Sequence, residues 1–173
     1  MLLAIDVGNT NIVFGVYDRI QQHWIQQWRI QTVHNRMPDE YAVMFRSLLQ
    51  EDASLNFNSF QQVIVCSVVP QLTAGLVDMI HSRTGERPLV VNSKLNTGIQ
   101  IDTDAPERVG ADIIADCVAA YARAETNCIV VDFGTATTFT AITDPGIMRG
   151  TAIAAGLNIT IDALVNETAQ LPQ

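Results

Sequence analysis

Two short segments of the chain place the same reactive residue types in the same order, each directly after an apolar run. Asp6–Thr10 and Asp132–Thr135 both contain an aspartate, then a glycine, then a threonine. A glycine can adopt a positive φ and leaves backbone N–H groups open to a ligand. A carboxylate at a strand end can hold a hydrated metal ion, and a threonine hydroxyl can meet a phosphate. Two such turns facing each other would hold the phosphates and the cation of a nucleotide.

A single turn of this kind is most often only a tight turn, so the evidence lies in its repetition. Each copy follows a run of Val, Ile and Leu and is followed by a second run of strand-forming residues, at 12–17 and at 138–142. Apolar strands on both sides of a glycine turn are typical of a β-hairpin. The sequence therefore predicts two hairpins and an internal duplication.

The composition limits the classes of partner. The chain has 173 residues, 48% of them hydrophobic and 16% charged, which suits one ordinary core or two small ones. A net charge of −8 argues against nucleic acid and anionic membranes as general partners. Lys94 is the only lysine, and no P-loop motif occurs. Any phosphate would therefore be bound by backbone amides, hydroxyls and a metal ion.

The three cysteines, Cys66, Cys117 and Cys128, are scattered and odd in number. We expect reduced, buried thiols in a cytoplasmic protein rather than a disulfide or a metal site. The three histidines have no metal-ligand spacing. The first residues lack a charged leader and Asp6 interrupts the apolar run, so we expect neither a signal peptide nor a membrane span.

The order of predicted elements is β-β-β-α-β-α-β, followed by a partial repeat. The first unit has strands at 2–8, 12–18, 23–30, 63–69 and 88–91. It also has two helices, one that begins at Asp39 and one that spans about 71–83. The repeat has a helix at 110–124, a hairpin around Asp132, a strand near 147–154 and a helix near 157–170. We therefore expect an α/β protein with a first unit at 1–95, a linker and active-site loop at 96–109, and a partial second unit at 110–173. Period 2 in the third strand places Trp24 and Trp28 on one face.

Six blocks of the sequence carry a more specific signal. In order and spacing they resemble the type III pantothenate kinases, within the acetate and sugar kinase/actin-like ATPase superfamily. The blocks are residues 5–11, 39–41, 66–70, 109–112, 131–138 and 168–172. The resemblance covers essentially the whole chain and the first two thirds of the family. It implies duplicated ribonuclease H-like β-β-β-α-β-α-β units, with the second unit incomplete.

The resemblance also implies an activity and roles for the matching residues. The activity is ATP-dependent phosphorylation of the primary hydroxyl of pantothenate, the first step of coenzyme A biosynthesis, in a homodimer. A hetero-oligomer with a chain that supplies the missing half is an alternative that the resemblance does not imply. Asp112 would accept the hydroxyl proton, Asp132 would hold K⁺ (or NH₄⁺), and Asp6 with the Gly8–Thr10 turn would hold phosphate and Mg²⁺. The implied ATP contacts are Asp6, Val7, Gly8, Asn9, Thr10, Asn11, Ile12, Val13 and Thr135, and the implied substrate contacts are Gly110, Ala111, Asp112 and Ile113.

The spacing alone leaves a simpler interpretation of Asp112, namely an acidic residue favoured by the dipole at a helix N-terminus. The flanking Gly110 and Ala111, which match the family, favour the catalytic interpretation. A carboxylate within hydrogen-bond reach of an alcohol can take its proton, and phosphoryl transfer needs little other than positioning and charge neutralisation.

The chain departs from the family pattern at four places. Ile113 stands where the family has an arginine that could pair with the pantothenate carboxylate, and Thr103 stands where it usually has a tyrosine. Gly150-Thr151 replaces a pair of glycines, and Ala155-Gly156 replaces Pro-Gly. The nucleotide half of the pattern is therefore kept more completely than the pantothenate half.

These departures leave three interpretations open. The chain is a pantothenate kinase, or it is a non-catalytic or half-catalytic subunit that needs a separate chain for the missing part. The third interpretation is a truncated product, which predicts an apolar surface left uncovered in the second unit.

Overall fold

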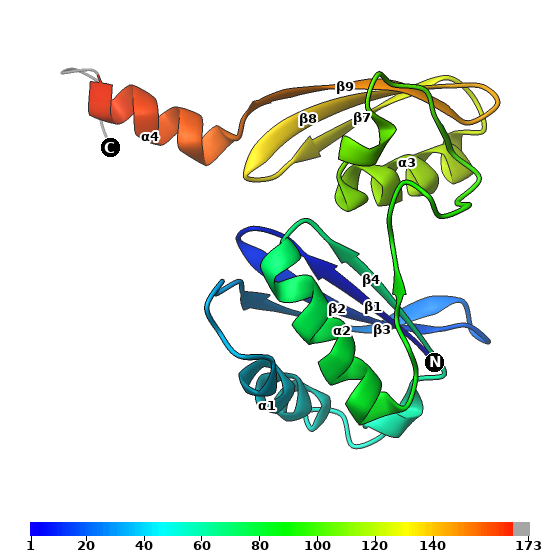
Figure 1. Ribbon diagram of the computed structural model, residues 1–173, viewed down its shortest axis with the longest axis vertical. Helices are drawn as coiled ribbons and strands as arrows, with labels where there is room; N and C mark the ends of the chain where they lie inside the picture. Colours follow the sequence, from blue (N-terminus) through cyan, green and yellow to red (C-terminus); the bar gives the residue numbers. More distant parts are fainter. Residues whose placement is uncertain (168–173) are drawn as a thin grey trace. The chain divides into compact units, whose positions relative to one another are not determined.

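The computed structural model describes residues 1–167 and divides into two compact units, each built on one sheet (Figure 1). Unit 1 consists of residues 1–92 together with 110–112, and unit 2 contains residues 93–109 and the described chain from residue 113 onward. Each unit is described separately below.

Unit 1 contains a five-stranded mixed sheet in the order β3-β2-β1-β4-β5. Its strands are β1 (Leu2–Val7), β2 (Asn11–Asp18), β3 (His23–Gln31), β4 (Gln62–Ser67) and β5 (Leu89–Val90). β1, β2 and β3 pair antiparallel in sequence order, while β4 pairs in parallel with β1 and with β5. The central strand β1 thus has a hydrogen-bonded neighbour on each side.

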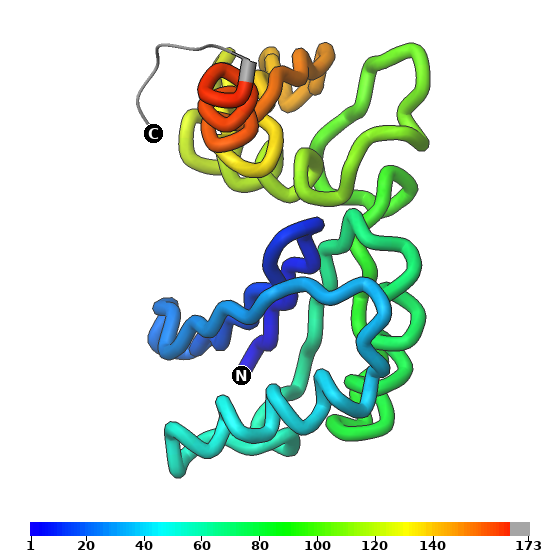
Figure 2. Tube along the Cα trace, turned by 90° about the vertical axis from the view of Figure 1, so that its left-hand side faces the viewer, coloured from blue at the N-terminus to red at the C-terminus, as the bar shows by residue number. Residues whose placement is uncertain are grey.

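Two helices, α1 (Pro38–Leu49) and α2 (Pro70–Thr84), lie against the sheet of unit 1, and Figure 2 shows α1 on one side of its strands. Proline at the first helical position fits both helix starts, because its missing N–H would have no partner there. Helix α2 ends at Gly85, whose φ of 77° suits a residue without a side chain. A short 3₁₀ turn, Phe57–Ser59, precedes β4.

The core of unit 1 is built around Phe45 of α1. Its ring stacks on Phe14 of β2 with centroids 4.4 Å apart, and it also contacts Phe60 and Trp28. On β1 the alternating residues Leu3, Ile5 and Val7 are 0%, 2% and 0% exposed. This alternation is the period-2 pattern of a strand with one face on a core.

The prediction that Trp24 and Trp28 share a face is wrong. Trp28 pairs with Phe14, but the β2–β3 register shifts so that Trp24 pairs with Tyr17. Because Phe14 and Tyr17 are an odd number of residues apart, they point to opposite faces. Trp28 is buried, whereas Trp24 is 59% exposed and lies over Gly15, where a Cβ would come within 2.7 Å of its ring. The extra residue of the bulge reverses the periodicity.

Unit 2 contains a four-stranded sheet in the order β6-β9-β8-β7. Its strands are β6 (Gln100–Ile101), β7 (Cys128–Phe133), β8 (Ala136–Thr143) and β9 (Ile147–Ala155). The helix α3 (Ala111–Ala124) covers one face through a cluster formed by Cys117, Ile142 and Met148. Strand β6 was not expected: it lies in the stretch interpreted as a loop, and two residues are too few to show periodicity.

The last described element is α4 (Leu157–Glu167). A helix was expected near 157–170, of which residues 168–170 lie outside the described residues, as does the sequence block at 168–172. Figure 1 shows α4 continuing beyond the end of β9 rather than folding back over the sheet. Within residues 1–167, none of the helices combines the length and the apolar character that crossing a membrane requires.

Candidate functional site

The first candidate phosphate-binding turn connects β1 to β2. Asp6 pairs with Val13, and the Gly8 N–H donates to the carbonyl of Asn11 over 2.9 Å, which closes the turn. The Thr32 side chain supports it, because its Oγ1 donates to the Gly8 carbonyl at 2.7 Å while its N–H donates to the Thr10 carbonyl at 2.9 Å. The turn is therefore braced from the end of β3.

The predicted ATP-binding stretch divides into exposed and buried side chains. Asp6, Asn9 and Thr10 are exposed, whereas Val7 and Ile12 are both 0% exposed and belong to the core. Val7 and Ile12 can thus offer a ligand only their backbone atoms. The polar side chains that this stretch can offer a ligand are one carboxylate, one hydroxyl and two amides, of which the Asn11 amide is half-buried.

The second candidate turn connects β7 to β8 and repeats the first. Asp132 pairs with Thr138, and the Gly134 N–H donates to the Ala136 carbonyl at 3.0 Å. Asp132 and Thr135 are exposed. The Asp132 carboxylate bends toward the turn: a Cβ placed on Gly134 would lie 3.6 Å from its Oδ2. The predicted duplication of the hairpin is thus present in the backbone and in its hydrogen bonds.

Gly156 supports the second turn from the start of α4. Its N–H donates to the Thr135 carbonyl at 3.2 Å, and its own carbonyl accepts from Thr160 at 2.9 Å. A Cβ at this position would collide with the carbonyl oxygens of Gly134 and Thr135, which are backbone atoms that cannot rotate away. A side chain at residue 156 would therefore displace the turn.

Asp112 lies in the first turn of α3, half-buried. Its carboxylate lies over the backbone of Gly110, and a Cβ there would collide with Oδ1. That same Cβ would lie 3.6 Å from Val68, whose N–H donates to the Val7 carbonyl at 3.0 Å. Unit 1 thus brings Asp112 to the end of the sheet where β1 and β4 finish and the first turn begins, the usual place for ligands in an open α/β sheet.

Two other predicted substrate contacts, and one departure from the family pattern, have different surroundings. Ala111 is 8% exposed, and Ile113 packs against the apolar cluster under α3 in unit 2. Thr103 has a buried hydroxyl oxygen that makes no hydrogen bond within the described residues. A buried hydroxyl without a partner is costly, so this position is not optimised for packing alone.

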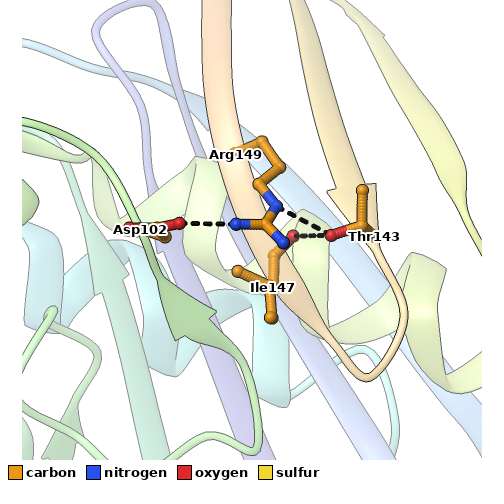
Figure 3. Close-up of polar contacts among 4 residues, drawn as sticks. All are labelled: Asp102, Thr143, Ile147 and Arg149. Atoms are coloured by element: carbon orange, nitrogen blue, oxygen red, sulfur yellow. Dashed lines mark hydrogen bonds and ion pairs between the residues drawn. The ribbon is translucent and has the colours of Figure 1, made fainter.

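Arg149 lies on β9 and carries a guanidinium, a group that can bind phosphate. It is half-exposed and engaged with protein groups: its Nη1 forms an ion pair with Asp102 Oδ2 at 2.6 Å, and its Nε donates to Thr143 Oγ1 at 2.9 Å (Figure 3). The Thr143 hydroxyl is in turn 3.5 Å from the Ile147 carbonyl. The guanidinium thus links the residue that follows β6 to strands β8 and β9, and its role is structural.

The carboxylates of the two turns suit cations that are held partly by the substrate. Within residues 1–167, no group of three or more His, Cys, Asp and Glu side chains could enclose a metal ion. Mg²⁺ in phosphoryl-transfer sites is typically held by one or two carboxylates together with substrate phosphates and water. The single exposed carboxylates of Asp6 and Asp132 fit that mode of binding.

Comparison with known proteins identifies the family. The sequence model described as type III pantothenate kinase matches residues 2–173. The chain belongs to the type III pantothenate kinase family. It is 44% identical to a protein of that name from Geobacter sulfurreducens, covering 100% of this chain and 67% of the relative. It is 40% identical to one from Geotalea uraniireducens, covering 100% and 66%. The chain spans about two thirds of the length of the curated relatives it matches.

Solved structures support the fold assignment for this member of the kinase family. A Ppx/GppA phosphatase from Aquifex aeolicus matches with a TM-score of 0.55 at 11% identity, covering 98% of this chain and 56% of that one. A protein from Sinorhizobium meliloti assigned as a 2-dehydro-3-deoxygalactonokinase matches with a TM-score of 0.55 at 12% identity, covering 98% and 58%. At these identities the likeness shows the fold alone, the ribonuclease H-like fold of the actin-like ATPases and sugar kinases, as predicted.

Sequence reasoning missed three residues that support these turns. Thr32, Val68 and Gly156 lie far along the chain from the groups that they contact. Gly156 had been noted only as a departure from a Pro-Gly pair. A lone glycine between a strand and a helix was the available sequence signal. The carbonyl groups that require a glycine there are brought to it only by the fold.

Proposed function

We propose that this chain carries the nucleotide-binding and proton-accepting part of a type III pantothenate kinase, which phosphorylates the primary hydroxyl of pantothenate with ATP for coenzyme A biosynthesis. The observation that carries the proposal is the placement of Asp112 at the same sheet end as the Asp6 turn, in a chain that matches the family over residues 2–173. A kinase needs an alcohol's proton acceptor beside a phosphate-binding turn.

Each residue has a defined part in this mechanism. The Gly8–Thr10 turn binds phosphate oxygens through backbone N–H groups and the Thr10 hydroxyl, and Thr135 contributes a second hydroxyl. Asp112 accepts the proton of the pantothenate hydroxyl while its oxygen attacks the γ-phosphorus of ATP and the bond to the β,γ-bridging oxygen breaks. Gly110 and Ala111 line the approach of the substrate, and Ile113 supplies an apolar contact where an arginine would pair with a carboxylate.

Two cations complete the proposed site. Asp6 would hold Mg²⁺ and Asp132 would hold K⁺ (or NH₄⁺), each together with phosphate oxygens. Bound cations neutralise charge that develops on the phosphoryl group during transfer. We also propose that the protein acts as an oligomer. Its three cysteines are free thiols, which supports a cytoplasmic location.

The experiment is a coupled ADP-release assay with and without pantothenate and potassium. Asp112→Asn should lower kcat by about 100-fold to 10,000-fold, the usual contribution of a general base, with little change in the KM for ATP. Asp78→Asn, which removes an exposed carboxylate from α2 of the same unit, is the matched control and should leave turnover unchanged. Full activity in a folded Asp112→Asn variant would reject Asp112 as the base.

A further inference from the structure

Thr32 is a buried threonine whose hydrogen bonds are made to the first turn. It directly follows β3 and is 7% exposed. Its Oγ1 donates to the Gly8 carbonyl at 2.7 Å, and its N–H donates to the Thr10 carbonyl at 2.9 Å. Burying a hydroxyl is costly, and valine would fill nearly the same space without a polar atom. What the threonine adds at this position is therefore its bond to Gly8.

The bond from Thr32 sets the direction of one peptide group in the turn. The Gly8–Asn9 peptide is trans, because the cis bond recorded within residues 1–167 is Asp144–Pro145. In a planar trans peptide the C=O and the N–H point in opposite directions. A Gly8 carbonyl that is held toward buried Thr32 therefore directs the Asn9 N–H away from the core, and Asn9 is exposed. This N–H is thus presented on the outer side of the turn.

Tyr41 of α1 fixes the segment that carries Thr32. Tyr41 is 0% exposed and belongs to the core of unit 1. Its hydroxyl donates to the Val33 carbonyl at 3.0 Å and accepts from the Val33 N–H at 2.9 Å. One buried hydroxyl thus binds both backbone groups of Val33, and a shift of this segment would leave them without partners. The packed helix α1 thereby positions Thr32 and, through it, the Gly8 carbonyl.

The second turn shows which contact is particular to the first. Gly156 follows β9 as Thr32 follows β3. Each N–H donates to the carbonyl of the threonine in its own turn, Thr10 at 2.9 Å and Thr135 at 3.2 Å, so the backbone contact is common to both copies. Residue 156 has no side chain, and it cannot supply a hydroxyl equivalent to that of Thr32. The first turn is therefore the one in which a side chain at this position fixes the direction of a peptide group.

We propose that Thr32 is a positioning residue for phosphate binding, which directs the Asn9 N–H toward a phosphate oxygen of ATP, and that Tyr41 supports it through Val33. This role rests on the function proposed above, since it names the backbone donor of the phosphate-binding turn and the side chains that orient it. An N–H that is already oriented binds an anion without rearrangement. A hydrogen bond to a charged group contributes roughly tenfold or more to affinity. Thr32 and Tyr41 are buried and act without touching the nucleotide.

The test measures ligand binding to the 173-residue chain by isothermal titration calorimetry, in the absence of pantothenate. The ligands are ATP with Mg²⁺ and inorganic tripolyphosphate. Thr32→Val removes the hydroxyl and should raise the dissociation constants of both ligands by about tenfold or more. Thr32→Ser keeps the hydroxyl and should bind both within about twofold of the unchanged chain. Tyr41→Phe should weaken binding by a smaller factor, because the bonds made by Thr32 itself remain.

Thr84→Val is the matched control. The Thr84 Oγ1 also donates to a backbone carbonyl of unit 1, that of Ile80 at 2.8 Å, but it does so at the last residue of α2. Both valine variants remove one such bond, so both should lower the free energy of unfolding in urea. Thr84→Val should nevertheless bind both ligands normally, which separates the positioning of the turn from a general loss of stability.

Binding and turnover are separate readouts. Binding of ATP that depends on Thr32, in a chain that shows no pantothenate-dependent ADP release, would support the positioning role and count against the kinase activity. Normal binding of ATP by a folded Thr32→Val variant would overturn the positioning role whatever the turnover. The role is also overturned if Thr32→Ser binds as weakly as Thr32→Val, if Thr84→Val weakens binding equally, or if the unchanged chain binds neither ligand.

Discussion

The contact between Gly110 and Asp112 makes a quantitative prediction about the proposed proton acceptor. Replacing Gly110 by alanine adds one methyl group, which meets Asp112 Oδ1 well inside van der Waals distance. The φ of Gly110 is not in the positive region, so alanine can adopt the backbone conformation. The strain is relieved by movement of the carboxylate, because the end of a side chain moves more easily than the backbone.

The size of the effect follows from that movement. The carboxylate oxygen must withdraw by about 1 Å, and a misplacement of about 1 Å in a reacting group costs on the order of 100-fold in rate. This corresponds to about 2.7 kcal/mol in the activation free energy. The free energy of unfolding should fall by less than about 1 kcal/mol, the usual difference between glycine and alanine just before a helix.

The assay compares kcat for ADP release with the free energy of unfolding in urea for each variant of the chain. The double variant Gly110→Ala/Asp112→Asn is the decisive control. If Gly110 acts through the Asp112 carboxylate, the double variant loses no more activity than Asp112→Asn alone. Additive losses, or a Gly110→Ala variant with normal kcat, would refute the reasoning.

Two further predictions concern unit 2. Gly156→Ala should lower the free energy of unfolding by about 1–3 kcal/mol, because the added methyl group would overpack against backbone carbonyls, and it should raise the KM for ATP. Thermal unfolding and ATP titration measure the two effects. A variant with unchanged stability would contradict the carbonyl clash. Burial, followed by the effects of Asp116 and Cys128, raises the pKa of the Cys117 thiol from 9.0 to about 11. Cys117 should therefore resist alkylation at pH 8 while Cys66 and Cys128 react. Because the folded state favours the protonated thiol, its contribution to stability should be present below pH 9 and lost toward pH 11, as measured by urea unfolding across that range.

Much of the architecture was predictable because its signals are local. An apolar run, a glycine turn and a second apolar run define a hairpin within about fifteen residues, and period 2 along β1 gives its buried face. The same locality explains the failures. A bulge placed Trp24 on the face opposite Trp28, and β6 was too short to show any pattern.

The sequence by itself determined the two aspartate turns, the order of the elements and, through resemblance, the family. Only the tertiary structure decided which groups meet: Gly156 under the Thr135 carbonyl, Thr32 behind the first turn, and Asp112 over Gly110 at the end of β1 and β4. It also decided that Leu3 and Ile129, equivalent positions in the two hairpins, are 0% and 69% exposed. The physical reason is that the alternation along a strand shows which face is apolar, whereas burial depends on which elements pack on that face in the tertiary structure.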